Sequence, residues 1–413
     1  MKIFCLAFAI LFCATLQGEE SGGIKVIRAG KMLDVKTGKL IENPVIVLKG
    51  DFIDSINPKV IPDKAEVLDL HDLILLPGLI DVHTHLTYDA GNYWLDLGRH
   101  PHAAAAAYSM VGVKNARITL LAGFTTVRDL GACCYADINL MRAIEKNLVD
   151  GPSVFPSGNI IATTGSACDQ TRADPSIVQP GPEYGLGDDP DSIVKAVRTQ
   201  IKYGAKVIKT CSDNDNYSEQ ELKLMADTAH QRRIKFAVHV WEEKSVRNAV
   251  NAGADSVEHA GIMSDDILDE MVRRGTYLVP TMYTLDTMDL SQMKPETRVQ
   301  VEKELPMFED AFRRSLKKGL KIAFGSDTGQ IPHGENAREF YAMVKRGMTP
   351  LHAIQSATCN AADLMSLTDR GLIAEGLRAD LIGVAGDPLE DIRALEKPAF
   401  VMKAGKVYKQ FAD

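Results

Sequence analysis

The sequence predicts an α/β protein whose main part is a (β/α)8 barrel, accompanied by a small discontinuous β-sandwich domain from both chain ends. Between residues 77 and 370, short apolar strand segments alternate with helical segments. Short β patterns separated by turn residues fill 24–76 and recur in 371–413. The 413 residues are 45% hydrophobic and 25% charged, so the chain can bury a core large enough for both parts.

The N-terminal segment, residues 1–18, has the pattern of a secretory signal peptide. Lys2 is followed by an apolar stretch that is too short to span a bilayer and then by a polar exit. The alternative is a short membrane anchor that is retained. We expect cleavage, a secreted or periplasmic protein, and no stable membrane span after processing.

Both ends of the mature chain contain short strands. We expect them at 24–28, 44–48, 52–56 and 65–70, and again at 380–385, 400–402 and 406–408. Turn residues such as Gly50-Asp51 and Asn57-Pro58 separate the first set. The two sets are expected to pair into one β domain, formed by 24–76 and 371–413.

The barrel domain, 77–370, is predicted from its alternating elements. Strands are expected at 75–83, 125–130, 154–162, 205–210, 235–240, 256–259, 277–280 and 321–325. Helices are expected between them, at 103–121, 135–148, 191–203, 218–232, 245–252, 264–274 and 296–318. A doubly wound open sheet is the alternative, but no Gly-x-Gly-x-x-Gly follows an early strand, so a dinucleotide-binding fold is unsupported.

The carboxyl ends of these strands carry residues that bind metals or transfer protons. His83 and His85 end the first strand, and alternate residues of a strand share a face. The later strand ends carry Lys209, His239, His259 and Asp327. Each residue alone has an ordinary structural explanation, such as a surface histidine or a capping aspartate. Because all six fall at the end where barrels place their chemistry, they predict a site for zinc or a similar divalent ion.

Charge and cysteine content restrict the other functions. The formal net charge of −8 argues against a nucleic-acid partner. Of seven cysteines, Cys5 and Cys13 lie in the leader, which leaves Cys133, Cys134, Cys168, Cys211 and Cys359. This odd, scattered set predicts no disulfide framework, and Cys211 is expected to be a buried structural cysteine.

Several motifs make the chain resemble the metal-dependent amidohydrolase superfamily, from about Lys25 to the C-terminus. They lie at 77–85, 123–130, 207–209, 325–327, 333–337 and 376–382. Within the superfamily, the chain is similar to the prolidase-like branch, which groups Xaa-Pro dipeptidases with imidazolonepropionase-related enzymes.

The resemblance implies a site for two divalent metal ions, with zinc as the expected metal. His83, His85 and Asp327 would hold the first ion, and His239 and His259 the second. Lys209 would be carboxylated to N6-carboxylysine and would bridge both ions. The chemistry is consistent, because a carbamate is an anion with two oxygens, and a desolvated lysine supplies the neutral amine that reacts with carbon dioxide.

The implied activity is hydrolysis of a non-ester C–N bond by a metal-bridging hydroxide, with Asp327 as general base and then acid. The expected substrate is a dipeptide or an N-acyl amino acid, and the enzyme would be dipeptidase- or carboxypeptidase-like. One alternative is a cyclic amide or lactone hydrolase of the imidazolonepropionase type. Another is a catalytically silent, metal-free binding protein, which the six intact ligand positions argue against. Homo-oligomerisation is left open.

Substrate contacts are predicted from residues near the strand ends. Tyr283 follows the seventh strand and His333 the eighth; the alternative for Tyr283 is a packed aromatic. Arg128 could meet a substrate carboxylate, or form a structural ion pair with Asp129. Two loops depart from the branch. Where relatives carry Thr-Gly-Gly-His-Gly, with a substrate-contacting histidine, this chain has residues 164–169 (Thr-Gly-Ser-Ala-Cys-Asp), and the loop after Lys209 is shortened to 211–217.

Overall fold

The computed structural model describes residues 23–90, 101–169, 171, 181–213 and 216–411. The predicted signal peptide, 1–18, lies outside the described residues. Within these ranges, no helix is both long and apolar enough to cross a membrane.

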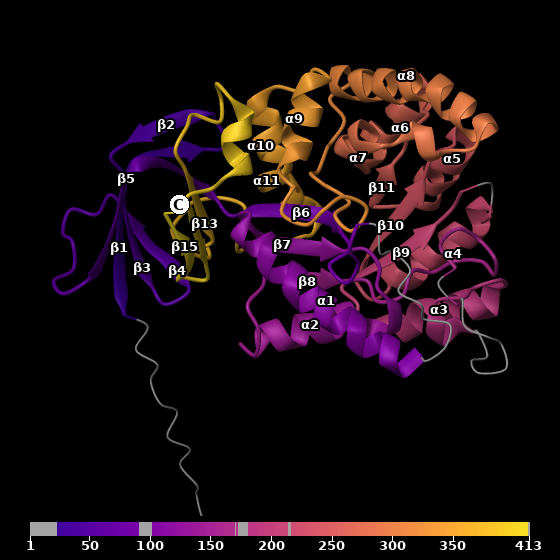
Figure 1. Cartoon of the computed structure of the whole chain (residues 1–413), viewed down its shortest axis with the longest axis horizontal. Coiled ribbons are helices and arrows are strands. Elements are labelled where there is room, and N and C mark those ends of the chain that lie inside the picture. Colours follow the sequence, from indigo (N-terminus) through magenta and orange to yellow (C-terminus); the bar gives the residue numbers. More distant parts are fainter. Residues whose placement is uncertain (1–22, 91–100, 170, 172–180, 214–215, 412–413) are drawn as a thin grey trace, which may run out of the picture.

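One sheet contains strands from both ends of the chain (Figure 1). Its N-terminal members are β1 (Ile24–Asp34), β2 (Lys39–Glu42), β3 (Val45–Lys49), β4 (Phe52–Ile56) and β5 (Glu66–Pro77). Its C-terminal members are β13 (Leu381–Val384), β14 (Phe400–Lys403) and β15 (Lys406–Gln410). The strand order is β15-β14-β13-β5-β1-β3-β4, and β2 pairs with β1. The two ends meet where β13 pairs antiparallel with β5, with Leu381 opposite Pro77. Side chains of this sheet's own strands, including Ile27, Ile46 and Phe400, form a buried cluster that is separate from the main core.

The strands that carry the predicted ligands form two parallel sheets. One contains β6 (Leu79–Thr84), β7 (Phe124–Asp129) and β8 (Ser153–Pro156). The other contains β9 (Val207–Cys211), β10 (Lys235–Val240), β11 (Ser256–His259) and β12 (Tyr277–Val279). Almost every residue of these strands is buried, as expected for parallel strands covered on both faces. Isolated bridges join Ile161 to Thr210 and Leu278 to Ile322.

Two predicted strands are shorter in the structure than in the sequence analysis. The third was expected at 154–162 but ends at Pro156, and Gly158 follows with a φ of 72°. The eighth was expected at 321–325, but the structure assigns only a bridge at Ile322. Successive N–H groups there bond to different segments, since the Ala323 N–H donates to the Leu278 carbonyl and the Phe324 N–H to the Ser356 carbonyl. No regular strand ladder is therefore assigned to 321–325. A closed eight-stranded barrel and a sandwich of the end strands therefore remain predictions.

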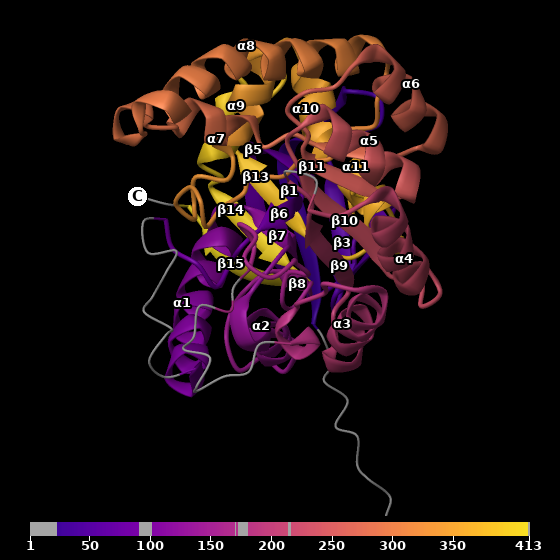
Figure 2. The same ribbon diagram turned by 90° about the vertical axis from the view of Figure 1, so that its right-hand side faces the viewer.

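Helices lie outside the strands β6 to β11 (Figures 1 and 2). They are α1 (Pro101–Leu121), α2 (Ala136–Glu145), α3 (Pro190–Tyr203), α4 (Glu219–His230), α5 (Glu243–Ala252), α6 (Asp265–Arg274), α7 (Met282–Thr287), α8 (Pro295–Lys317), α9 (Arg338–Lys345), α10 (Pro350–Ser356) and α11 (Cys359–Leu364). Local sequence explains several starts. Ser218 and Glu221 form a capping box at α4, and Asp189 caps α3 immediately before Pro190.

Candidate metal centre

Three of the predicted ligands converge at the end of β6. Nε2 of His83 lies 3.6 Å from Oδ1 of Asp327, and Nε2 of His85 lies 3.5 Å from the same oxygen. Ligand atoms of the three residues all fall within 4.8 Å of one another, and all three residues are buried. Two imidazoles and a carboxylate at these separations could hold one divalent ion.

Asp81 and Gly325 bring Asp327 beside the two histidines. Asp81, on β6, accepts hydrogen bonds from the Ser326 N–H and hydroxyl at 3.1 and 2.5 Å. Gly325 is needed for the close approach, because a Cβ at this position would lie 2.7 Å from Cβ of His83. The Gly-Ser-Asp segment is thus held against β6, although the two lie about 245 residues apart in the chain.

The other three predicted residues line the same cavity. Lys209 and His239 come from β9 and β10, and His259 ends β11. The four histidine rings form a row in which His85 lies 5.4 Å from His83 between centroids, His83 lies 5.0 Å from His259, and His259 lies 4.5 Å from His239. The structure therefore brings all six predicted ligands together in one place.

Left-handed backbone conformations occur at the ligands themselves. The φ angles are 67° at His259, 44° at Ala260 and 59° at Asp327, a region that costs free energy for residues other than glycine. In a regular strand, Glu258 and His259 would point to opposite faces of the sheet. The turn at His259 lets both side chains reach the site.

Each histidine except His239 has its Nδ1 engaged, which leaves Nε2 toward the cavity. Nδ1 of His83 donates to Oε2 of Glu258 at 2.8 Å, and Nδ1 of His85 donates to the Gly131 carbonyl at 3.1 Å. Nδ1 of His259 pairs with the Thr281 hydroxyl at 2.7 Å. Such partners orient metal-binding imidazoles and fix their tautomer.

His239 is held by its other nitrogen. Its Nε2 lies 2.8 Å from Oδ2 of Asp213, in the segment that follows β9. An ion that this ring binds would therefore be held through Nδ1, or Asp213 would have to move. Asp213 thus fixes the orientation of the His239 ring through one nitrogen, as Glu258 fixes the orientation of His83.

Glu258 is itself paired with a buried cation. Oε1 accepts from the Arg128 guanidinium at 2.9 Å and from the Ser256 hydroxyl at 2.5 Å. Arg128 also donates to the Val82 carbonyl at 2.6 Å. Arg128 and Glu258 are almost completely buried, so each compensates the charge of the other.

Burial sets the ionisation of the ligands. It lowers the pKa of His85 to about 3, with the Lys209 charge as the next cause, and it lowers the pKa values of His83 and His259 well below 6.5. Burial raises the pKa of Asp327 to about 6. These three histidines are thus neutral near pH 7, the form that binds metals.

Lys209 has the least satisfied side chain at the site. It is 2% exposed, and among the described residues its Nζ has no hydrogen-bond partner. Burial lowers its pKa to about 8. A buried, unpartnered amine beside four histidines is unfavourable as an ammonium, but it fits conversion to an anionic bridging ligand. The donor set therefore fits a two-metal centre, with three ligands on one side and two histidines on the other.

The cavity at this site has a volume of about 300 Å³. Within the part of the chain that the structure describes, its lining consists of the six predicted ligands together with Ile160, Ala167, Cys168, Cys211 and Gln330. Four of the five added residues are apolar, so a polar floor faces a mainly apolar wall. This combination is typical of a site for a small molecule.

None of the three predicted substrate contacts is among the lining residues. The Tyr283 hydroxyl meets Arg338 at 2.7 Å, and Nε2 of His333 meets the Tyr88 carbonyl at 2.9 Å. Arg128 contacts Glu258, which in turn contacts His83, so it is separated from the cavity. The expected ion pair with Asp129 is therefore wrong, because the guanidinium pairs with Glu258. Substrate contact by these three residues remains a prediction.

The expectation of no disulfides is also wrong, although Cys211 is buried as predicted. The structure pairs Cys168 with Cys211 and Cys133 with Cys134 in disulfides, and Cys359 is free. Sequence reasoning missed these pairs as well as Glu258 and Asp213. The carboxylates had one usable signal, since each lies within four residues of a predicted ligand, but nothing in the spacing showed which histidine each would hold.

Comparisons with known proteins agree with the site. The Amidohydrolase family model matches residues 74–408. The ochratoxinase of Aspergillus niger is 29% identical, with 94% of this chain and 88% of that protein covered. The crystal structure of a Xaa-Pro dipeptidase with bound methionine in its active site is 33% identical, with a TM-score of 0.86 and coverage of 94% of this chain and 100% of that one. The imidazolonepropionase of Pyrobaculum arsenaticum is 25% identical, over 77% of this chain and 78% of that protein. The resemblance drawn from the motifs is confirmed.

Proposed function

The chain belongs to the amidohydrolase family, and from this premise we propose that it hydrolyses the amide bond of a dipeptide or an N-acyl amino acid with two bound metal ions. Metal-dependent amide hydrolysis is what the family and the hydrolase relatives support. The observation that carries the proposal is the convergence of His83, His85 and Asp327 in one cavity with the unpartnered Lys209.

The proposed ligand assignment follows the positions of the side chains. His83, His85 and Asp327 would hold the first ion, and His239 and His259 the second. Lys209, as N6-carboxylysine, would bridge them. When bound, the ions would polarise the amide carbonyl and lower the pKa of a water molecule. Zinc is the proposed metal because imidazole and carboxylate are its usual ligands.

The side chains of the protein have distinct proposed roles in the reaction. Asp327 would take a proton from the attacking water and pass it to the leaving nitrogen, as a general base and then a general acid. Glu258 and Thr281 would hold the rings of His83 and His259 in place while charge develops. The apolar wall would exclude water from the rest of the substrate.

A dipeptide or N-acyl amino acid is proposed as substrate on two grounds. The ochratoxinase and the Xaa-Pro dipeptidase relatives are named for substrates of this general size. A cavity of about 300 Å³ is at the small end of ligand sites, so it excludes a folded polypeptide. The imidazolonepropionase similarity favours a cyclic amide as the second candidate.

We also propose that the protein is secreted or periplasmic. The N-terminal segment has the pattern of a signal peptide. The Cys168–Cys211 disulfide supports export, because disulfides persist mainly in oxidising compartments. For the fold, we propose that the seven strands of the two parallel sheets and the segment 321–325 form one (β/α)8 barrel, supported by the bridges from Ile161 to Thr210 and from Leu278 to Ile322.

A hydrolysis screen of zinc-loaded protein tests the activity. The panel would contain dipeptides with C-terminal proline or other residues, N-acyl amino acids, cyclic imides and lactones, with an Asp327→Asn variant as the inactive control. We expect turnover of linear amides and none in the variant. Turnover of cyclic imides or lactones alone would refute the linear-amide proposal and favour the second candidate.

A further inference from the structure

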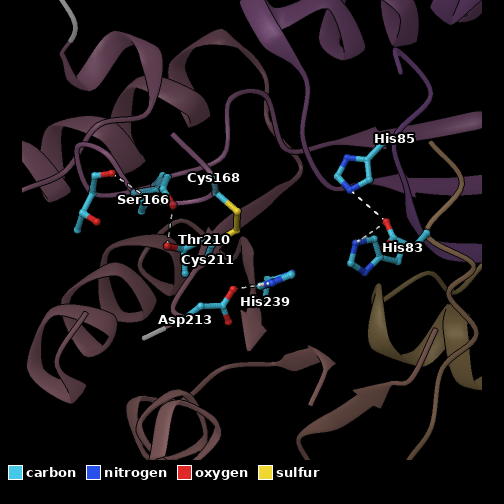
Figure 3. Close-up of a disulfide and its surroundings, with 11 residues drawn as sticks. His83, His85, Ser166, Cys168, Thr210, Cys211, Asp213 and His239 are labelled. Atoms are coloured by element: carbon cyan, nitrogen blue, oxygen red, sulfur yellow. Dashed lines mark hydrogen bonds and ion pairs between the residues drawn. A yellow bond between two sulfur atoms is a disulfide. The ribbon is translucent and has the colours of Figure 1, made fainter. Parts of the chain in front are cut away.

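The Cys168–Cys211 disulfide lies in the wall of the metal-centre cavity. Cys211 ends β9, two residues after Lys209, and it is the register partner of His239 on the neighbouring strand. Cys168 belongs to the segment 163–169, and the bond closes a sequence separation of 43 residues. Both cysteines line the cavity, and Figure 3 shows the sulfur bridge beside Asp213 and His239, with His83 and His85 apart from it.

Among the described residues, few other contacts are seen to attach the segment 163–169 to the protein. Its sequence, Thr-Thr-Gly-Ser-Ala-Cys-Asp, has no large apolar side chain to bury. Thr164 donates from its N–H and hydroxyl to Asp188 at 2.7 and 2.6 Å. Other hydrogen bonds lie within the segment, such as those from the Gly165 N–H to Asp169 and from the Ser166 hydroxyl to Thr163. Exposed hydrogen bonds of this kind add little stability, so among the described contacts the disulfide is the main attachment of the segment to the rest of the protein.

The opposite half of the bond is rigid. The Thr210 hydroxyl donates to the Ile161 carbonyl at 2.8 Å, and the Ser212 N–H donates to the His239 carbonyl at 2.9 Å. Cys211 is 3% exposed between these two anchors. The disulfide therefore joins a weakly held segment to a fixed strand end, and loss of the bond would free the segment and leave the strand in place.

The segment contributes Ala167 and Cys168 to the lining of the cavity that also contains His239. Beyond the six predicted ligands, the described residues that line the cavity are Ile160, Gln330, Ala167, Cys168 and Cys211, and the last three lie at or beside the disulfide. A group placed next to the second pair of histidines must fit between this wall and the ligands. We propose that the Cys168–Cys211 disulfide determines substrate size, by fixing the segment 163–169 as one wall of the cavity.

The inference rests on the proposed function only in taking this cavity as the substrate site, so its test measures binding and does not depend on activity. The probes are straight-chain hydroxamic acids, from acetohydroxamic to octanohydroxamic acid, which chelate a bound metal and extend an alkyl tail of graded length. Titration calorimetry on zinc-loaded protein, purified without reductant, would compare the wild type with Cys168→Ala/Cys211→Ala. Cys359→Ser removes the free thiol and is the matched control.

We expect the wild type and Cys359→Ser to bind the long acids poorly relative to the short one. In the double variant, this discrimination should fall by roughly 10-fold, with zinc content unchanged. An unchanged length dependence would refute the proposal, as would zinc loss in the variant, because the bond would then organise ligands rather than a wall. Free thiols at both positions in non-reduced peptide maps of the wild type would also refute it. If the length dependence shifts but no amide is hydrolysed, the proposed function fails and this inference stands.

Discussion

Oε2 of Glu258 lies 2.8 Å from Nδ1 of His83, and both side chains are almost completely buried. The same carboxylate neutralises Arg128 through its other oxygen. Glu258 therefore has two separable functions. It holds the imidazole of His83, a proposed metal ligand, in one tautomer, and it compensates a cation that water cannot reach.

Glu258→Gln should affect both functions. We expect zinc affinity at the first site to fall roughly 10- to 100-fold, because the imidazole loses its anionic partner. We also expect the free energy of unfolding to drop by about 3–5 kcal/mol, because Arg128 stays buried and unpaired. Metal titration and denaturant unfolding measure the two effects.

Ser256→Ala is the matched control for Glu258→Gln. It removes the hydroxyl that donates to the same carboxylate and accepts from the Arg128 guanidinium at 3.1 Å, and it leaves the charge, so its cost should be about 1–3 kcal/mol. Adding Arg128→Met to Glu258→Gln should recover stability without recovering zinc affinity. Zinc affinity at the wild-type level in Glu258→Gln would contradict the orienting role.

The alternation of side chains along a strand predicted that His83 and His85 share a face, but it did not predict that Glu258 contacts His83. His83 and His85 could be predicted because alternate strand residues share a face. The same rule places Glu258 and His259 on opposite faces, and only the left-handed conformation of His259 brings both to the site. A positive φ at a histidine has no sequence signature, so the partner of His83 could not be identified from the chain alone.

The disulfide was missed for a different reason. Cys168 and Cys211 are far apart in sequence, and cysteine spacing does not specify connectivity. Their bond depends on the bridge that sets Ile161 beside Thr210, which is a tertiary contact between the two parallel sheets. Cys168 and Cys211 lie in the two loops whose sequences depart from the related enzymes, but nothing in either loop sequence indicates that the loops meet.

Lys209→Ala should remove metal and activity together. If Lys209 bridges two ions as a carbamate, its loss leaves them without a shared anion, and kcat/KM should fall on the order of 1000-fold. Acetate or formate supplied at high concentration should restore part of the activity by entering the space of the side chain. Lys206→Ala is the control, because Lys206 precedes the same strand and is exposed. Full activity and two bound ions in Lys209→Ala would rule out the bridging role.

Metal loading of the apoprotein should depend on pH through Lys209. Burial lowers its pKa to about 8, so the amine is mostly protonated below that pH, and the neutral form that reacts with carbon dioxide becomes dominant above it. At fixed dissolved carbon dioxide, zinc-dependent reactivation should be roughly 25-fold faster at about pH 8.5 than at about pH 6.5. Stopped assays of reactivation measure the rate. Loading that is independent of pH and of carbon dioxide would mean that the lysine acts without carboxylation.

Asp213 should orient His239 for the proposed second ion, as Glu258 should orient His83 for the first. Its Oδ2 lies 2.8 Å from Nε2 of His239, so Asp213→Ala releases the ring and should weaken the second zinc site about 10-fold while the first site keeps its affinity. Asp213→Asn keeps a hydrogen-bond acceptor without the charge, so its affinity for zinc at the second site should lie between those of the wild type and Asp213→Ala. Asp227→Ala, which removes an exposed carboxylate that pairs with Lys223, is the control. Calorimetric titration of the apoprotein separates the two binding events.

Equal weakening of both zinc sites in Asp213→Ala would mean that the carboxylate acts on the whole centre and not through His239. If instead Asp213→Ala weakens only the second site and Glu258→Gln weakens only the first, each carboxylate supports one of the two metal sites.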